Sequence, residues 1–169
     1  MYRTIRPMVL NRQRRVPVPV NDLERFLARA RRALRLAPDS LTVCLVTDAE
    51  IARWNRAYRG KPKPTDVLSF PSDDDHPRHR KLRRSDVRRR GSSSISFASS
   101  PSSASYLGDI AIAPAVARRN ARRFGRTFDD EMRILILHGI LHLMGYDHET
   151  DTGEMDRREQ RLRRALGLA

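Results

Sequence analysis

The sequence is poor in cysteine and in long apolar runs. Its 169 residues include one cysteine, Cys44, so no disulfide framework can form within the chain. A single thiol fits a reducing compartment, and we expect Cys44 to be a small buried residue inside its apolar run. No apolar run approaches the ~20 residues of a membrane span, and the N-terminus lacks the apolar core of a secretory signal. We therefore expect a cytoplasmic protein with no membrane partner.

Acidic residues are also few, with 20 Asp and Glu against 34 Lys and Arg, which gives a net charge of +14. An excess of this kind favours a nucleic-acid partner, because each neutralised phosphate releases counterions. The alternative is an arginine-rich surface that is simply solvated. The length suits one domain with a core and is short for two, so we expect a single domain over residues 1–169.

Residues 72–106 differ from the rest of the chain in composition. They hold eight Lys or Arg, four Asp and eleven Ser, without a periodic apolar face. This composition is typical of a solvated, disordered insertion within the domain. The segment is either an RNA-binding arm or a neutral linker. The chain outside it keeps most of the positive charge, so the folded body is expected to be basic by itself.

Apolar periodicity and capping signals predict an α+β fold, with a small mixed sheet of about four strands and helices packed on it. Asn21 with Glu24, and Thr47 with Glu50, have the spacing of capping boxes at helix starts. The expected strands are 8–10, 15–20, 41–46, 66–70 and 107–112, and the expected helices follow Asn21, Thr47, Ala113, Thr127 and Asp151. Pro71 predicts that strand 66–70 lies at an edge.

Three of the five histidines fall within eleven residues, as H-x-x-x-H-x-x-G-x-x-H at 138–148. His138 and His142 are four apart and share one face of the predicted helix. Gly145 allows the chain to leave the helix in a left-handed conformation, so that His148 can return as a third ligand. A histidine pair alone is often accidental, but three imidazoles around one Zn²⁺ would leave a fourth position open, as catalytic zinc sites do.

This motif, H-G-I-L-H-L-M-G-Y-D-H, resembles that of the YbeY family of zinc-dependent endoribonucleases. Two further stretches are similar to the family: Arg59-Gly60 followed by P-T-D-V-L-S-F-P at 64–71, and L-G-D-I at 107–110. The resemblance covers about 8–71 and 107–168. The long insertion departs from the family pattern and puts in doubt the shape of the groove near it.

The resemblance implies a single-strand-specific endoribonuclease that matures the 16S rRNA 3′ end and acts in late ribosome quality control. The expected partners are single-stranded RNA, rRNA and the ribosome or its small subunit, and not DNA. His138, His142 and His148 match the ligands of one Zn²⁺, and Arg59 matches the basic residue that acts on the phosphate. Asp147 is either a turn residue or a group that orients a ligand. Asp66 and Asp109 are either structural residues, which we favour, or groups that orient a ligand.

Two other functions remain open from the residues alone. Metzincin-like metalloproteases share the histidine spacing, but they carry Glu after the first histidine as general base, and this chain has Gly139 there. The other alternative is a non-catalytic, zinc-containing RNA-binding factor in ribosome assembly. A fourth protein ligand would favour that alternative.

Overall fold

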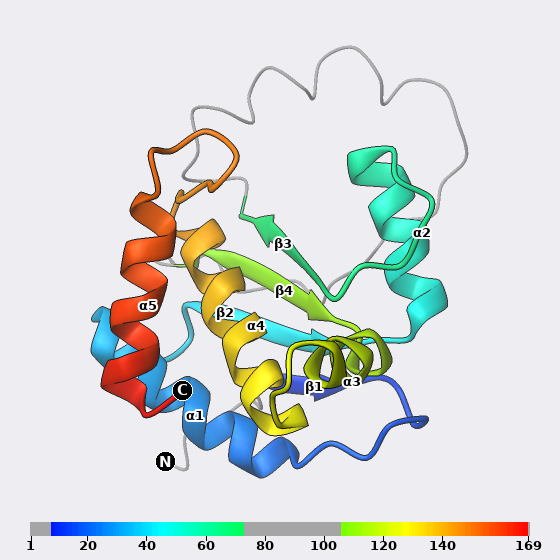
Figure 1. Ribbon diagram of the computed structural model, residues 1–169, viewed down its shortest axis with the longest axis horizontal. Helices are drawn as coiled ribbons and strands as arrows, with labels where there is room; N and C mark the ends of the chain where they lie inside the picture. The colour runs from blue at the N-terminus through cyan, green and yellow to red at the C-terminus, as the bar shows by residue number, and fades with distance from the viewer. Residues whose placement is uncertain (1–7, 73–105, 169) are drawn as a thin grey trace, which may run out of the picture.

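The computed structural model describes residues 8–72 and 106–168, and its centre is a four-stranded mixed sheet (Figure 1). The strand order is β1-β2-β4-β3, where β1, β2 and β4 are parallel and β3 is antiparallel to β4. The strands are β1 (Val9–Asn11), β2 (Leu41–Leu45), β3 (Val67–Pro71) and β4 (Gly108–Ile112). Both the α+β class and the edge position of β3 are confirmed.

Five helices cover the two faces of this sheet unequally. One face carries the larger core, where side chains of β2 and β4 such as Val43 and Ile110 pack with helices α1, α4 and α5. On the other face, Ile51 and Trp54 of α2 pack against Cys44 and Ala111. The helices are α1 (Val20–Leu34), α2 (Asp48–Arg59), α3 (Pro114–Arg123), α4 (Phe128–Leu143) and α5 (Glu154–Leu166).

The register of β3 on β4 depends on a close backbone approach at Gly108. Its φ is +138°, and a Cβ built there would lie 2.1 Å from the carbonyl oxygen of Phe70. Only glycine tolerates both conditions. The L-G-D-I stretch therefore has a structural reason for its glycine, because any larger residue would push the edge strand off the sheet.

Two expectations at the start of the chain are wrong. Residues 15–20 form no strand, because the buried Gln13 side chain bonds to both the N–H and the carbonyl of Val16 and fixes a turn there. The proposed capping box of Asn21 and Glu24 does not form, and α1 begins two residues earlier, after Pro19. Glu24 instead accepts hydrogen bonds from the N–H groups of Met8 and Val9, at 2.8 and 2.7 Å.

The capping box at the start of α2 is confirmed. The Thr47 hydroxyl accepts from the Glu50 N–H, and the Glu50 carboxylate accepts from the Thr47 N–H. The insertion expected at 72–106 lies outside the described residues except at its ends. There, Ser72 bonds to Leu107 and Tyr106, which ties both ends to the sheet. In the part of the chain that the structure describes, the helices are too short or too polar to cross a membrane.

Glu24 and Asn21 offer a direct test of the N-terminal packing. Glu24→Ala removes the acceptor of two backbone N–H groups, so we expect the free energy of unfolding to fall by about 1–2 kcal/mol. Asn21→Ala, the matched control, should change it by less than about 0.5 kcal/mol, because Asn21 is exposed and caps nothing. Urea denaturation of both variants measures the difference, and a larger loss for Asn21→Ala would contradict the structure.

Candidate metal centre

Helix α4 carries His138 and His142 at the two positions between Ile134 and Leu143 that are not buried. Thr127 caps the helix by accepting from the Asp130 N–H, and acidic residues occupy its first turn, where they suit the helix dipole. Every residue from Ile134 to Leu143 is buried except the two histidines, which are half-buried. The packing of the other side chains therefore fixes where both imidazoles point.

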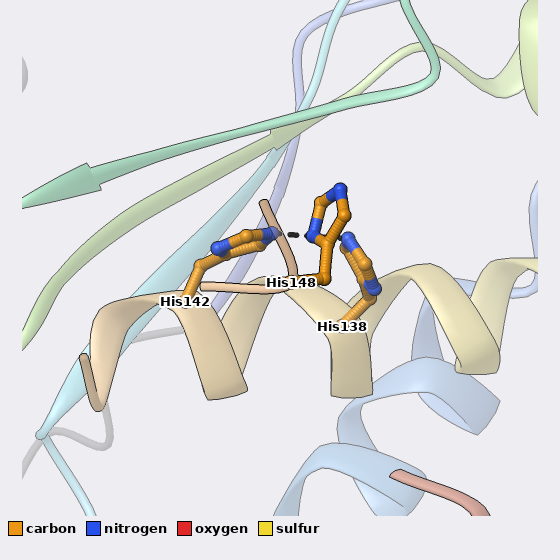
Figure 2. Close-up of side chains that lie close together, drawn as sticks. All are labelled: His138, His142 and His148. Carbon is orange, nitrogen blue, oxygen red and sulfur yellow. Dashed lines mark hydrogen bonds between the residues drawn. The ribbon is translucent and has the colours of Figure 1, made fainter. Parts of the chain in front are cut away.

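The loop after α4 brings the third histidine to the same place. Gly145 has a φ of +92°, the left-handed conformation that its position predicts, and the Tyr146 N–H bonds back to the Leu141 carbonyl. His148 then folds over the helix, and all three rings point toward one another in Figure 2. One nitrogen from each ring lies within 4.8 Å of the others, so the three can hold one metal ion.

The hydrogen bonds of the two helical histidines indicate which nitrogens are free. His138 Nδ1 lies 2.9 Å from a Glu159 carboxylate oxygen, and His142 Nδ1 lies 3.1 Å from the Tyr146 carbonyl oxygen. These oxygens accept hydrogen bonds, so each Nδ1 carries the ring hydrogen. The two Nε2 atoms face each other at 3.1 Å. In the neutral form that binds metals, both rings would offer these Nε2 atoms to one cation.

The surroundings of His142 favour its neutral form. Burial lowers the pKa of His142, and its neighbours His138 and His148 lower it further. A neutral imidazole is the form that binds a metal. The donor set therefore fits a divalent transition metal in geometry, and the lowered pKa of His142 favours its metal-binding form.

Glu159 on α5 orients His138, and the sequence analysis missed it. Burial raises the pKa of Glu159, but the hydrogen bond from His138 and the charge of Arg163 outweigh it and leave the pKa below its ordinary value. Glu159 is thus a buried carboxylate that bonds to both partners. Its sequence signal was an acid on the apolar stripe of α5, between Met155 and Leu162.

Gly139 faces the sheet and not the histidines. A Cβ built on it would lie 2.8 Å from Ile110 Cγ2 and 2.9 Å from Ile110 Cδ1, and its carbonyl accepts from Ser69 Oγ at 3.1 Å. A glutamate at this position would have to displace the side chain of Ile110 on β4. The scaffold therefore leaves no room at this helix position for the general base of a metzincin protease.

Arg59 is placed beside the loop that carries His148. It is the last residue of α2, and Gly60 ends the helix in a left-handed conformation. Its guanidinium lies 3.3 Å from a carboxylate oxygen of Glu149, ninety residues away in sequence. Both side chains are exposed, so a competing anion can replace the carboxylate at low cost.

The three aspartates considered from sequence form their hydrogen bonds to groups other than the histidines. Asp147 accepts from the Glu149 N–H and the Thr150 hydroxyl, which makes it a turn residue. Asp66 accepts from the Val67 N–H and the Asn120 side chain, and Asp109 accepts from the Tyr106 hydroxyl. None of the three forms a hydrogen bond to a histidine among residues 8–72 and 106–168.

The fold is α+β, and its mixed sheet supports a buried helix that carries two of three converging histidines. This arrangement defines a metal-binding protein with a site for one ion. Comparison with known proteins identifies the family. The family model described as Endoribonuclease YbeY matches residues 9–167, so the chain belongs to the YbeY family.

Relatives bearing the name Endoribonuclease YbeY are similar over most of their length. The protein of Roseiflexus castenholzii is 37% identical over 87% of this chain and 83% of its own. The protein of Solibacter usitatus is 39% identical over 92% and 86%, respectively. The solution structure of a Thermotoga maritima protein matches with a TM-score of 0.55 at 26% identity, over 94% of this chain and 89% of that one.

Glu159 provides the first prediction for this site. Glu159→Ala should weaken binding of Zn²⁺, used as the probe ion, by about 10–100-fold, because His138 loses the partner that fixes its ring. Glu159→Gln retains a hydrogen-bond acceptor, so its affinity for Zn²⁺ should lie between those of the unchanged protein and Glu159→Ala. Glu154→Ala, on the exposed side of the same helix, is the control. Competition with a chromophoric chelator measures the dissociation constants, and equal affinity for all variants would refute an orienting role.

Gly139→Ala tests the contact with the sheet. The change gains up to about 1 kcal/mol of helix propensity but forces a methyl group into Ile110, for which we expect a net destabilisation of about 1–2 kcal/mol. Thermal unfolding of the metal-free protein measures it. An increase in stability would show that the Ile110 side chain moves aside, and it would remove the steric argument against a glutamate at position 139.

Proposed function

We propose that this protein is a metal-dependent endoribonuclease that cleaves single-stranded RNA in 16S rRNA 3′-end maturation and late ribosome quality control. The observation that carries the proposal is the convergence of one ring nitrogen from each of His138, His142 and His148, within 4.8 Å of one another, in a chain of the YbeY family. Its relatives are named as endoribonucleases. The proposed partners are rRNA and the small ribosomal subunit in the cytoplasm.

His138, His142 and His148 would hold the metal, which we propose to be one Zn²⁺. When bound, zinc supplies a Lewis acid that polarises a phosphoryl oxygen or lowers the pKa of a water molecule. Three imidazole ligands would leave one coordination position open for that chemistry. The protein's part is to keep the three nitrogens convergent, through buried packing of α4 and the bond from His138 to Glu159.

Arg59 would bind the scissile phosphate and stabilise the charge that develops on it. Its planar guanidinium can donate two parallel hydrogen bonds to a phosphate. In the free protein this side chain is paired with Glu149, the residue that follows His148 in the chain. We propose that the RNA phosphate replaces Glu149 on Arg59, which brings the arginine into action only when substrate is present.

The metalloprotease alternative is disfavoured by the packing of Gly139 against Ile110. The basic surface also suits a polyanion better than a peptide. The non-catalytic assembly factor differs from our proposal in needing a closed metal site. The histidine cluster found among the described residues offers three protein ligands, which is the donor number of a catalytic zinc site.

His142→Ala tests the metal requirement. We expect it to lose both zinc retention and cleavage of a single-stranded RNA, because one of two facing ligands is gone. Chelation of the unchanged protein should do the same reversibly, while casein stays intact throughout. Metal content by atomic emission and RNA products on a gel give the measurements. RNA cleavage at the normal rate by zinc-free protein, or digestion of casein, would reject the proposal.

Arg59→Ala tests the phosphate role. We expect kcat to fall about a hundredfold with zinc content unchanged, since a charged donor aimed at the transition state is lost. Arg59→Lys should recover only part of the lost kcat, because an ammonium group cannot donate two parallel hydrogen bonds to one phosphate as a guanidinium does. Arg164→Ala, an exposed arginine of α5, is the charge-matched control. A change in KM alone would assign Arg59 to ground-state binding.

A further inference from the structure

A cavity of about 250 Å³ lies at the ends of the central strands, between the first turns of α2 and α3. Its walls come from the segment after β1, the start of α2 and the start of α3. Arginines dominate the polar lining. The residues that line it are Gln13, Arg15, Val16, Val46, Thr47, Asp48, Ala115, Arg118 and Arg119. We call this the arginine cavity.

The topology of the sheet makes this place a crevice. β2 and β4 are parallel neighbours, and their arrowheads in Figure 1 point to the side where α2 begins and α3 lies. The helix after β2 packs on one face with Trp54, whereas the helix after β4 packs on the other face through Ala117. Adjacent strands whose connections leave on opposite faces open a gap at their carboxyl ends, which is where open α/β sheets bind ligands.

The cavity has more positive charge than its own acids neutralise. Asp48 pairs with Arg119 at 3.0 Å. Within the described ranges, the side chains of Arg15 and Arg118 form neither an ion pair nor a hydrogen bond, and both are exposed. Helix α3 adds its first-turn N–H groups, which no side chain caps. Two free guanidinium groups, one tethered guanidinium and a helix N-terminus together suit a phosphate.

The cavity lies at the opposite end of α2 from Arg59. Twelve helical residues from Asp48 to Arg59 span about 16 Å. The turns between carry Arg53 and Arg56, both exposed. A chain of positive side chains thus leads along α2 from the arginine cavity to the histidine cluster.

We propose that the arginine cavity binds a backbone phosphate of single-stranded RNA, at a point on the strand remote from the bond that is cleaved. The ligand class rests on the proposed function, because only a polyanionic strand would occupy both ends of α2. Arg15 and Arg118 donate hydrogen bonds to the phosphate from the two sides of the cavity. Asp48 holds the Arg119 side chain in the lining of the same cavity. The second anchor fixes where along the strand the histidine cluster acts.

Paired variants of equal charge test this site. Arg15→Gln with Arg118→Gln removes the two free guanidinium groups of the cavity. Arg14→Gln with Arg122→Gln removes one exposed arginine from the same loop and one from the same helix, outside the cavity. Binding of the full-length, zinc-loaded protein to a nuclease-resistant 2′-O-methyl RNA dodecamer is followed by fluorescence anisotropy across a series of salt concentrations.

We expect the cavity pair to weaken binding about tenfold and to reduce the slope of log Kd against log salt by about 0.7, the value for one phosphate contact on a single strand. The control pair should weaken it less than about threefold, through general charge alone. In a ¹⁵N-labelled sample, the amide of Ala115 should shift on addition of the dodecamer. Equal effects of the two pairs, or an unmoved Ala115 amide, would overturn the proposal.

Two further arms separate the possible causes of failure. A shift of the Ala115 amide with adenosine 5′-monophosphate but not with the dodecamer would overturn the assignment to an RNA strand in favour of a mononucleotide. RNA cleavage by the unchanged protein is measured separately. Cleavage without a difference between the pairs rejects the arginine cavity alone, whereas a clear difference without any cleavage rejects the proposed nuclease activity and retains the cavity as an RNA site.

Discussion

Two imidazole Nε2 atoms facing each other at 3.1 Å are the constraint on which the rest of the site depends. A cation bound between them would accept a lone pair from each neutral ring. The two rings keep this arrangement because α4 cannot rotate: it packs on the sheet, on α1 and on α5, and its residues from Ile134 to Leu143 other than the two histidines are buried. The Glu159 carboxylate then prevents the His138 ring from turning away. The core therefore maintains an arrangement that the histidines by themselves would not adopt.

The sheet determines on which side this arrangement opens. β3 runs antiparallel at the edge, and its Ser69 hydroxyl donates to the carbonyl of Gly139, the residue after the first histidine. Two glycines allow this fit: Gly108 lets β3 lie against β4, and Gly139 lets α4 lie against Ile110. On the neighbouring surface of α4, His138 and His142 remain half-buried, and His148 in the following loop is exposed.

The sequence predicts interactions that are local and misses those that cross the fold. The i, i+4 histidines, the left-handed Gly145 and the Thr47 capping box follow from spacing alone, and the structure has all three positions as expected. Glu159 and Glu149 could not be paired with His138 and Arg59, because their partners lie 21 and 90 residues away. Glu24 has the same local spacing as a capping glutamate, but two N–H groups from β1 outcompete that role.

The distribution of acids, more than the total charge, determines which arginines can bind a phosphate. Arg126 is paired with the buried Glu131 and Arg163 with Glu159, so both serve the fold. Arg59 and Arg119 are held by exposed or half-exposed acids, in pairs that contribute little and exchange easily. A net charge of +14 would suit any polyanion, but preorganised, exchangeable guanidinium groups beside a metal site and beside a crevice suit an extended strand that passes over both.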